Sequence, residues 1–402
     1  MNTDSEKIEE LLTRSVDSIY PNKEALKEVL LSNKKISVYV GIDPTADYVH
    51  LGHSTNYLLL ERLHKLGHKI IVLVGDFTAM IGDPTDKMAA RVVLTKDQVV
   101  KNLATFKSQI GKILDFENKE NPIEFRFNSE WLSKLTFEKI IDLASNFTVQ
   151  QMLQRDMFEK RISENKPLFV HEFFYPLMQG YDSVALEVDL EIGGTDQTFN
   201  MLAGRTLVRR YLNHEKFVLT TTLLVDPITG EKMMSKSLGT GVGLNETANN
   251  MFGKIMALPD FGIIQVFIDC TRLSMVDVME KKRRLDMGEN PKNIKVELAK
   301  EIVTLYHGKE MAQKAEEDFE NTFKKGGIPE DTKEVLVNKG ESLSKIFLEQ
   351  GIVKSKGELR RLMEEGAVKE ADGGIINDFE YIINKNLTLR VGKRRFIKIK
   401  VD

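Results

Sequence analysis

The most informative segment of this chain reads Gly41-Ile42-Asp43-Pro44-Thr45-Ala46-Asp47-Tyr48-Val49-His50-Leu51-Gly52-His53. The β-rich run 36–42 predicts a strand, and an amphipathic pattern after the turn predicts a helix that continues to about Leu66. His50 and His53 therefore lie near a helix N-terminus just beyond the end of a strand. Backbone N–H groups and the helix dipole favour anions there, and Gly52 lets a ligand approach the backbone. We expect a nucleotide at this turn.

The overall composition is ordinary for a globular protein. With 402 residues, 42% of them hydrophobic and 29% charged, the chain is long enough for about two to four domains. A net charge of −3 predicts that any basic surface for nucleic acid is local. One cysteine, Cys270, excludes an internal disulfide and is typical of a reducing compartment. Because residues 1–7 hold no apolar signal core and no run is long enough to cross a membrane, we expect a cytoplasmic protein without a membrane partner.

Strand-like and helix-like segments alternate from residue 35 to about residue 225. This order is typical of βαβ units and predicts an α/β fold with a mostly parallel, Rossmann-like sheet in a catalytic domain over residues 1–240. Ligands bind such sheets at the carboxyl ends of the strands. A helical insertion at about 130–165 interrupts the alternation. The predicted strands are 36–42, 69–75, 123–127, 188–192 and 217–224.

The pattern changes after residue 245. Residues 245–325 predict a helical domain, in which Ile294, Leu298, Ile302 and Leu305 share one helix face. Gly326-Gly327-Ile328-Pro329 is typical of a linker. Residues 340–402 predict a small α+β module, with helices at 343–350 and 355–365 and strands near 367–369 and 387–400.

A second polar segment reads Glu231-Lys232-Met233-Met234-Ser235-Lys236-Ser237-Leu238-Gly239-Thr240-Gly241. Lys236 is a point charge suited to a polyphosphate. Alone, this loop is typical of a solvated turn, and the two histidines are typical of an ordinary helix start. Metal binding by His50 and His53 is not favoured, because no Cys or nearby carboxylate completes a ligand set. Both segments belong to one α/β domain, which makes these ordinary explanations weaker and favours a nucleotide ligand.

A third cluster adds polar groups to the same edge of the sheet. Tyr175, Gln179 and Asp182 are spaced to project from one face of a helix, although a solvent-facing polar stripe has the same spacing. Gly193-Gly194-Thr195-Asp196-Gln197 follows a strand, so its glycines allow close approach and its carboxylate can accept hydrogen bonds from ribose hydroxyls. Asp83 follows the strand at 69–75.

Together these segments resemble the two signatures of class I aminoacyl-tRNA synthetases, His-Ile-Gly-His and Lys-Met-Ser-Lys-Ser. Leu51 replaces Ile in the first. In the second, Met233 stands where the family has its first Lys, and Lys232 lies one position earlier. The third cluster and Tyr39 match bacterial-type tyrosyl-tRNA synthetases, and residues 340–402 resemble the S4-like RNA-binding domain that those enzymes carry.

The resemblance implies an enzyme that activates L-tyrosine with ATP, giving tyrosyl-adenylate and pyrophosphate, and then transfers tyrosine to the 3′ end of tRNA(Tyr). It implies Mg²⁺ accompanying ATP and held mainly by the phosphates, with no metal site built by the protein. It also implies a homodimer formed through the insertion at 130–165. The implied catalytic residues are Thr45, His50, His53 and Lys236, with Lys87, Arg91 and Lys232 as candidate assistants.

The same resemblance assigns the binding residues. Tyr39 and Asp182 would hold the phenol of tyrosine, Tyr175, Asp83 and Gln179 its ammonium group, and Gln197 its carboxyl group. ATP would be bound by Gly41, Asp43, His50, Gly52, His53, Gly194, Asp196 and Lys236, of which Asp43, Asp196 and Gly194 line the nucleoside. tRNA would be bound by Lys354, Lys356, Arg360 and Arg361, in a basic C-terminal region that also holds Lys393, Arg394, Arg395, Lys398 and Lys400.

Four alternatives stay open at this point. Basic residues on a helix and an edge strand also keep a domain soluble. A tryptophanyl enzyme shares the catalytic fold, but an indole offers only a donor, whereas Tyr39 and Asp182 suit a hydroxyl. A non-catalytic RNA-binding protein on a synthetase scaffold is disfavoured by the intact His50, His53 and Lys236, although Met233 leaves it open. A nucleotidyltransferase would explain the ATP signatures but not the third cluster.

Overall fold

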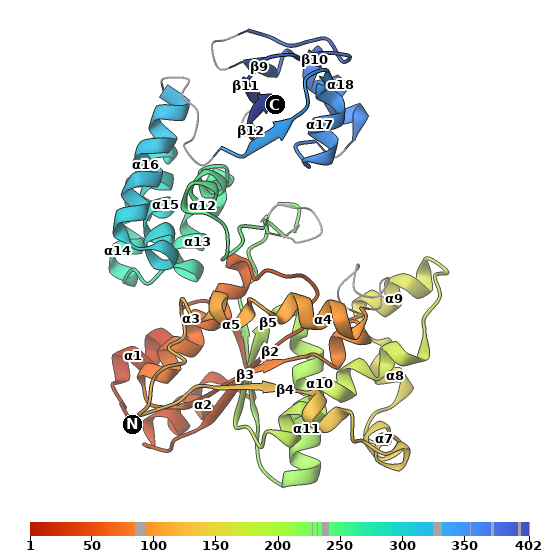
Figure 1. The fold of residues 1–402 in the computed structure, drawn as a ribbon. Helices are drawn as coiled ribbons and strands as arrows, with labels where there is room; N and C mark the ends of the chain where they lie inside the picture. The colour runs from red at the N-terminus through yellow and green to blue at the C-terminus, as the bar shows by residue number, and fades with distance from the viewer. Residues whose placement is uncertain are drawn as a thin grey trace. The chain divides into compact units, whose positions relative to one another are not determined.

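The computed structural model describes residues 1–84, 94–226, 228–230, 232–234, 241–324, 332–353, 355–370, 374–392 and 395–401. The chain divides into two compact units, one formed by Met1–Glu246 with Leu258–Ile294 and the other by Thr247–Ala257 with Lys295–Asp402. Each unit has its own sheet (Figure 1). The predicted division at 1–240, 245–325 and 340–402 stays a prediction.

A six-stranded sheet with the order β1-β6-β5-β2-β3-β4 forms the centre of the first unit. Five of its strands are parallel, and they confirm the five predicted strands: β2 (Ser37–Ile42), β3 (Lys69–Val74), β4 (Glu124–Phe127), β5 (Leu190–Gly194) and β6 (Phe217–Thr221). The central strands are nearly continuous apolar runs because helices cover both faces, with α1 to α3 on one side and α10 and α11 on the other (Figure 1).

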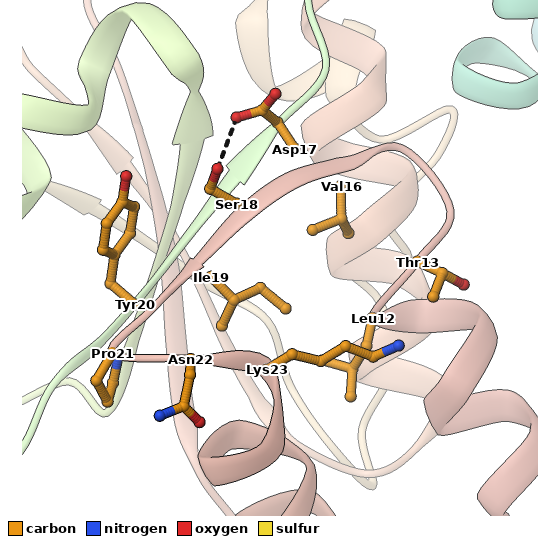
Figure 2. A pocket seen from close by; sticks show the side chains of 10 residues that line it. All are labelled: Leu12, Thr13, Val16, Asp17, Ser18, Ile19, Tyr20, Pro21, Asn22 and Lys23. Atoms are coloured by element: carbon orange, nitrogen blue, oxygen red, sulfur yellow. Dashed lines mark hydrogen bonds between the residues drawn. The ribbon is translucent and has the colours of Figure 1, made fainter.

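The sequence did not predict the sixth strand, β1 (Val16–Tyr20), which pairs antiparallel with β6 at the edge of the sheet. A shallow pocket of about 570 Å³ lies around it and is lined by Leu12, Thr13 and residues 16–23. Figure 2 shows this pocket and the hydrogen bond that Ser18 donates to Asp17, at 2.9 Å. None of the residues predicted for the active site lines this pocket.

Helices connect these strands and position the ends of the parallel ones. Helix α10 (Tyr175–Ala185) approaches α11 (Thr198–Leu212) closely, since a Cβ on Gly180 would lie 3.1 Å from the backbone nitrogen of Gly204. The predicted insertion is helical. The other helices of this unit are α1 (Ser5–Leu11), α2 (Lys23–Leu31), α3 (Leu51–Lys65), η1 (Thr78–Met80), α4 (Lys96–Leu103), α5 (Phe106–Ile110), α6 (Ser129–Leu132), α7 (Phe137–Ala144), α8 (Val149–Leu153), α9 (Asp156–Ser163), η2 (Val170–Phe173), η3 (Thr195–Gln197), η4 (Asp260–Gly262), α13 (Ile263–Cys270) and α14 (Met275–Asp286).

The second unit combines helices with a small sheet of order β7-β12-β11-β9. The predicted strand at 387–400 is two antiparallel strands, because the chain turns at Gly392, whose φ is +69°. On the predicted helix face Ile294, Leu298 and Ile302 are buried, but Leu305 is only partly buried. The elements are α12 (Ala248–Met256), α15 (Pro291–His307, which begins in the first unit), α16 (Lys309–Lys324), β7 (Glu334–Val337), β8 (Glu341–Ser342), α17 (Leu343–Glu349), α18 (Lys356–Glu364), β9 (Val368–Glu370), β10 (Ile382–Ile383), β11 (Leu387–Val391) and β12 (Arg395–Val401).

Within the described ranges, no single helix is both long and apolar enough to cross a membrane, and one pair, Ala248–Met256 with Asp260–Cys270, meets that test of length and composition only when its members are taken together.

Candidate active site

The two predicted signature histidines are fixed at the start of α3. His50 caps the helix, and its Nδ1 accepts a hydrogen bond from the Gly52 N–H at 3.1 Å, while Nδ1 of His53 accepts one from the His50 N–H at 3.3 Å. This reciprocal cap places the ring centroids 3.9 Å apart. A Cβ on Gly52 would lie 3.0 Å from the His50 ring, so a glycine leaves room for this arrangement. Backbone bonds therefore orient both imidazoles before any ligand binds.

The end of the second signature lies beside the first. His50 forms an isolated antiparallel bridge with Gly243, and the Leu51 N–H donates to the Val242 carbonyl at 3.0 Å. A Cβ on Gly241 would lie 3.5 Å from atoms of the His50 side chain. The chain therefore brings the two segments together, as an ATP site shared between them requires. Lys236 itself lies outside the described residues, as do Lys87, Arg91, Lys354, Lys393 and Arg394.

Near its start, the second signature contacts one of the residues predicted to line the nucleoside of ATP. Lys232 donates to Asp196 Oδ2 at 2.8 Å, and both side chains are partly open to solvent. Met233 does not extend in the same way, because its side chain packs against Gly262. A Cβ on Gly194 would lie 2.7 Å from Asp196 Oδ1, so this glycine gives the carboxylate its space. Lys232 therefore lies at the site predicted for the ribose of ATP.

Tyr39 and Asp182, predicted to hold the phenol of tyrosine, are both buried. Asp182 accepts hydrogen bonds from Trp131 Nε1 at 2.7 Å and from Asn128 Nδ2 at 3.3 Å. Burial raises the pKa of Asp182 and that of Tyr39 well above their ordinary values, and the charge of Glu191 adds to the effect at Tyr39. Trp131 and Asn128, which come from the segment around α6, were not predicted from the sequence. The signal was present, since Trp131 is the single tryptophan of the chain.

A buried ion pair supports this pocket and was also missed. Lys216 and Glu191 are both almost fully shielded from solvent and are joined by a short contact. Glu191 accepts further hydrogen bonds from Gln179 Nε2 at 3.1 Å and from Ser183 Oγ at 3.3 Å. No local signal marks this pair, because Lys216 follows His214-Glu215 and belongs by sequence to a polar turn before the strand.

The ion pair sets the direction of the hydrogen bonds around Tyr39. An ionised carboxylate only accepts, so Ser183 donates to Glu191. The oxygen of Ser183 is then left to accept from the Tyr39 hydroxyl, which lies 2.9 Å away. With its proton used in this way, Tyr39 presents lone pairs to the pocket. A ligand that meets them must donate, as the hydroxyl of a phenol does.

Four predicted residues meet at the polar end of the pocket. Tyr175 donates to Asp43 Oδ2 at 2.9 Å, and Gln197 Nε2 donates to Asp83 Oδ2 at 2.7 Å. Burial raises the pKa of Tyr175 well above its usual value, and the charges of Asp43 and Asp83 act in the same direction. A Cβ on Gly75 would lie 1.9 Å from Asp43 Oδ1, so that carboxylate fits only because residue 75 is glycine. Since Tyr175 and Asp182 are buried, the alternative of a solvent-facing stripe on α10 is wrong.

Of the remaining predicted residues, Gly41 lies in β2 and Thr45 lies on the turn between β2 and α3. Thr45 donates its N–H to the Asp43 carbonyl at 2.8 Å, and the Cα of Gly41 faces open space, with nothing within 4 Å of an added Cβ. In the described part of the chain, no group of three or more His, Cys, Asp or Glu side chains is arranged to hold a metal ion.

Residues 31–324 match the family model described as tRNA synthetases class I (W and Y). The chain belongs to this family. The synthetase is similar over 97% of its length to the tyrosine–tRNA ligase of Carboxydothermus hydrogenoformans, with 43% identity and 97% of that protein covered. It is 42% identical to tyrosine–tRNA ligase 2 of Clostridium acetobutylicum, with 98% of each chain covered.

Solved structures share the fold of this synthetase. A C-terminally truncated mitochondrial tyrosyl-tRNA synthetase from Aspergillus nidulans matches with a TM-score of 0.66 and 21% identity, covering 79% of this chain and 94% of its own. The tyrosyl-tRNA synthetase of Archaeoglobus fulgidus, solved with L-tyrosine, matches with a TM-score of 0.60 and 23% identity, covering 78% of this chain and 99% of its own. The predicted α/β class with a parallel sheet is confirmed.

Proposed function

We propose that the chain ligates tyrosine to tRNA in two steps at the site around Tyr39, Asp182 and the paired signatures. The observation that carries this proposal is that Asp182 is buried and that hydrogen bonds from Trp131 and Asn128 fix the orientation of its carboxyl group. Such a group suits a phenol hydroxyl, whereas phenylalanine offers it no further hydrogen bond. The relatives named tyrosine–tRNA ligases support the same substrate.

The first step needs no nucleophile from the protein. A carboxylate oxygen of tyrosine attacks the α-phosphorus of ATP, a new O–P bond forms, and the bond to the leaving pyrophosphate breaks. Catalysis then consists of positioning the reactants and offsetting the charge that grows on the phosphates. We assign this role to Thr45, His50, His53 and Lys236, with Lys232 held nearby through Asp196. Mg²⁺ accompanies ATP and is held mainly by its phosphates.

In the second step the 3′-terminal ribose hydroxyl of tRNA attacks the carbonyl carbon of tyrosyl-adenylate, and AMP leaves. We propose that the exposed cations Lys356, Arg360 and Arg361 on α18 contact the tRNA backbone, as phosphate-positioning groups do. Converting all three to Glu should abolish charging and leave tyrosine activation intact. The variant Lys345→Glu on α17 is the matched control, because Lys345 already faces Glu341 at 3.4 Å. Normal charging by the triple variant would exclude this surface.

The experiment that tests the whole proposal is tyrosine-dependent exchange of pyrophosphate into ATP. Tyrosine should support exchange, and tryptophan and phenylalanine should not. Exchange with tryptophan instead would favour the tryptophanyl alternative, and no exchange with any amino acid would favour a non-catalytic RNA-binding protein. We place the activity in the cytoplasm.

We also propose that the synthetase is a homodimer formed through the helical insertion. Large apolar side chains are exposed there, with 76% of Phe137, 68% of Val149 and 55% of Ile141 accessible. A patch of this kind is typical of a subunit interface. Phe137→Asp should therefore yield monomers in sedimentation velocity, whereas Val276→Asp on α14, where 80% of the side chain is exposed, should leave a dimer. A dimer in both variants would place the interface elsewhere.

A further inference from the structure

A cavity of about 280 Å³ lies against helices α1 and α3 in the first unit, and none of the residues predicted for the active site lines it. Cationic side chains outnumber carboxylates among the ten lining residues, by five to two. The cations are Lys7, Arg14, Arg62, Lys65 and Arg272, and the carboxylates are Glu10 and Glu61.

Protein groups already neutralise most of these cations. Glu61 is shared by Lys65 at 2.8 Å and Arg272 at 3.0 Å. Arg14 pairs with Glu10 at 3.0 Å, and its other donors bind backbone carbonyls, including that of Thr271 at 2.9 Å. Both carboxylates of the cavity are therefore engaged with other cations.

Arg62 is the exception. Its Nη1 is shielded from solvent and has no hydrogen-bond partner, and no ion pair joins Arg62 to any residue in the described ranges. Burial, with the charge of Arg14 in support, lowers the pKa of the Arg62 guanidinium to about 10, which still leaves it charged at neutral pH. The carboxylates of Glu10, Glu61 and Asp269 act on it only from beyond ion-pair distance. A partly buried guanidinium without a counter-ion is costly.

We propose that this cavity is a binding site for a small inorganic oxyanion of the phosphate class, with Arg62 as its principal ligand. The planar guanidinium presents donors in a fork that matches two oxygens of such an ion, and the neighbouring cations add attraction. The dipole of α3 favours cations near its C-terminal end, and this explains part of the positive charge of the cavity. It does not explain why the guanidinium of Arg62 is shielded from solvent. The hollow shape favours a compact ion over an extended polynucleotide.

Thermal unfolding of the full-length enzyme tests this proposal. Sodium phosphate replaces sodium chloride at constant ionic strength, with the active site filled by tyrosine and a non-hydrolysable ATP analogue so that the subsites for all three phosphates of ATP are occupied. A ligand that binds only the folded state raises the melting temperature saturably. We expect that saturable rise in the wild type and its loss in Arg62→Met. In chloride alone, Arg62→Met should melt at a higher temperature than the wild type, because an unpaired charge has been removed.

The matched control is Arg283→Met, which removes an exposed guanidinium paired with Glu280 at 2.8 Å and should retain the saturable rise. Phosphate also stabilises proteins non-specifically. An equal rise in the wild type and both variants, or no saturable rise in the wild type, would overturn the proposal. Saturation by a short oligonucleotide but not by phosphate or pyrophosphate would also overturn it. Unchanged pyrophosphate exchange in Arg62→Met confirms that the variant is folded, and it separates this site from the proposed catalytic one.

Discussion

The side chain of Met233 lies against the backbone of Gly262, so closely that a Cβ on Gly262 would be 2.1 Å from Met233 Cε. The Met233 N–H also donates to the Leu224 carbonyl at 2.8 Å. In this synthetase the residue that replaces the first signature lysine is therefore an anchor, and Lys232 beside it takes up the contact with Asp196.

Gly262→Ala should disturb this anchor without disturbing the fold, because the atom that must move is the flexible end of a methionine. We expect the KM for ATP in pyrophosphate exchange to rise about fivefold, which corresponds to about 1 kcal/mol for a weakened hydrogen bond. The KM for tyrosine should not change. Gly253→Ala is the control, since nothing lies within 4 Å of its added Cβ. Equal KM values for ATP in both variants would show that the Met233 contact does not position Lys232.

Trp131→Phe removes one of the two donors to Asp182. Leaving a buried acceptor less satisfied costs about 1–3 kcal/mol, so kcat/KM for tyrosine should fall by roughly one to two orders of magnitude. The inhibition constant of phenylalanine, measured as a competitor of tyrosine in the same exchange assay, should change far less, because that amino acid makes no hydrogen bond to the carboxyl group. A parallel loss of affinity for both amino acids would indicate general damage to the pocket instead of loss of hydroxyl recognition.

Lys216→Met should strongly destabilise the protein, by about 3–5 kcal/mol, since it leaves the buried Glu191 without its partner. The double variant Lys216→Met/Glu191→Gln should recover most of that stability in denaturant unfolding. The amide that Glu191→Gln introduces can donate as well as accept, so the direction of the hydrogen bonds from residue 191 through Ser183 to Tyr39 is no longer fixed. We therefore expect a folded enzyme with a raised KM for tyrosine. A double variant with normal KM would show that the ion pair serves stability alone.

His68 makes folding stability depend on pH. It is buried, and burial lowers its pKa from 6.5 to about 4. Between these values the unfolded chain binds more protons than the folded one, so the free energy of unfolding should rise as pH increases from about 4 to 6.5 and then level off. Urea unfolding at pH 5 and pH 7.5 measures this slope, and His68→Gln should reduce it. An identical slope in the variant would assign the pH dependence to other groups.

The sequence predicted the parallel strands because β2 and β3 are apolar runs followed by turn residues. It also predicted that Tyr175, Gln179 and Asp182 share one face of α10, but it left open whether that face points inward. It did not predict β1, whose five residues mix Asp and Ser with apolar side chains and which packs at an edge. The network of Ser183, Glu191 and Lys216 also escaped prediction, since it joins residues of α10, β5 and the start of β6. Such pairs depend on register between distant segments, which local patterns do not encode.

The place of Trp131 has a practical consequence. Its indole N–H is bonded to the carboxyl group proposed to receive the substrate hydroxyl, and the chain contains no other tryptophan. The enzyme thus carries its single tryptophan at the proposed point of amino-acid recognition, and tryptophan can be excited selectively in the presence of the nine tyrosines. Intrinsic emission should report occupancy of the pocket in real time, so that tyrosine binding and adenylate formation can be timed separately by stopped flow in unlabelled protein.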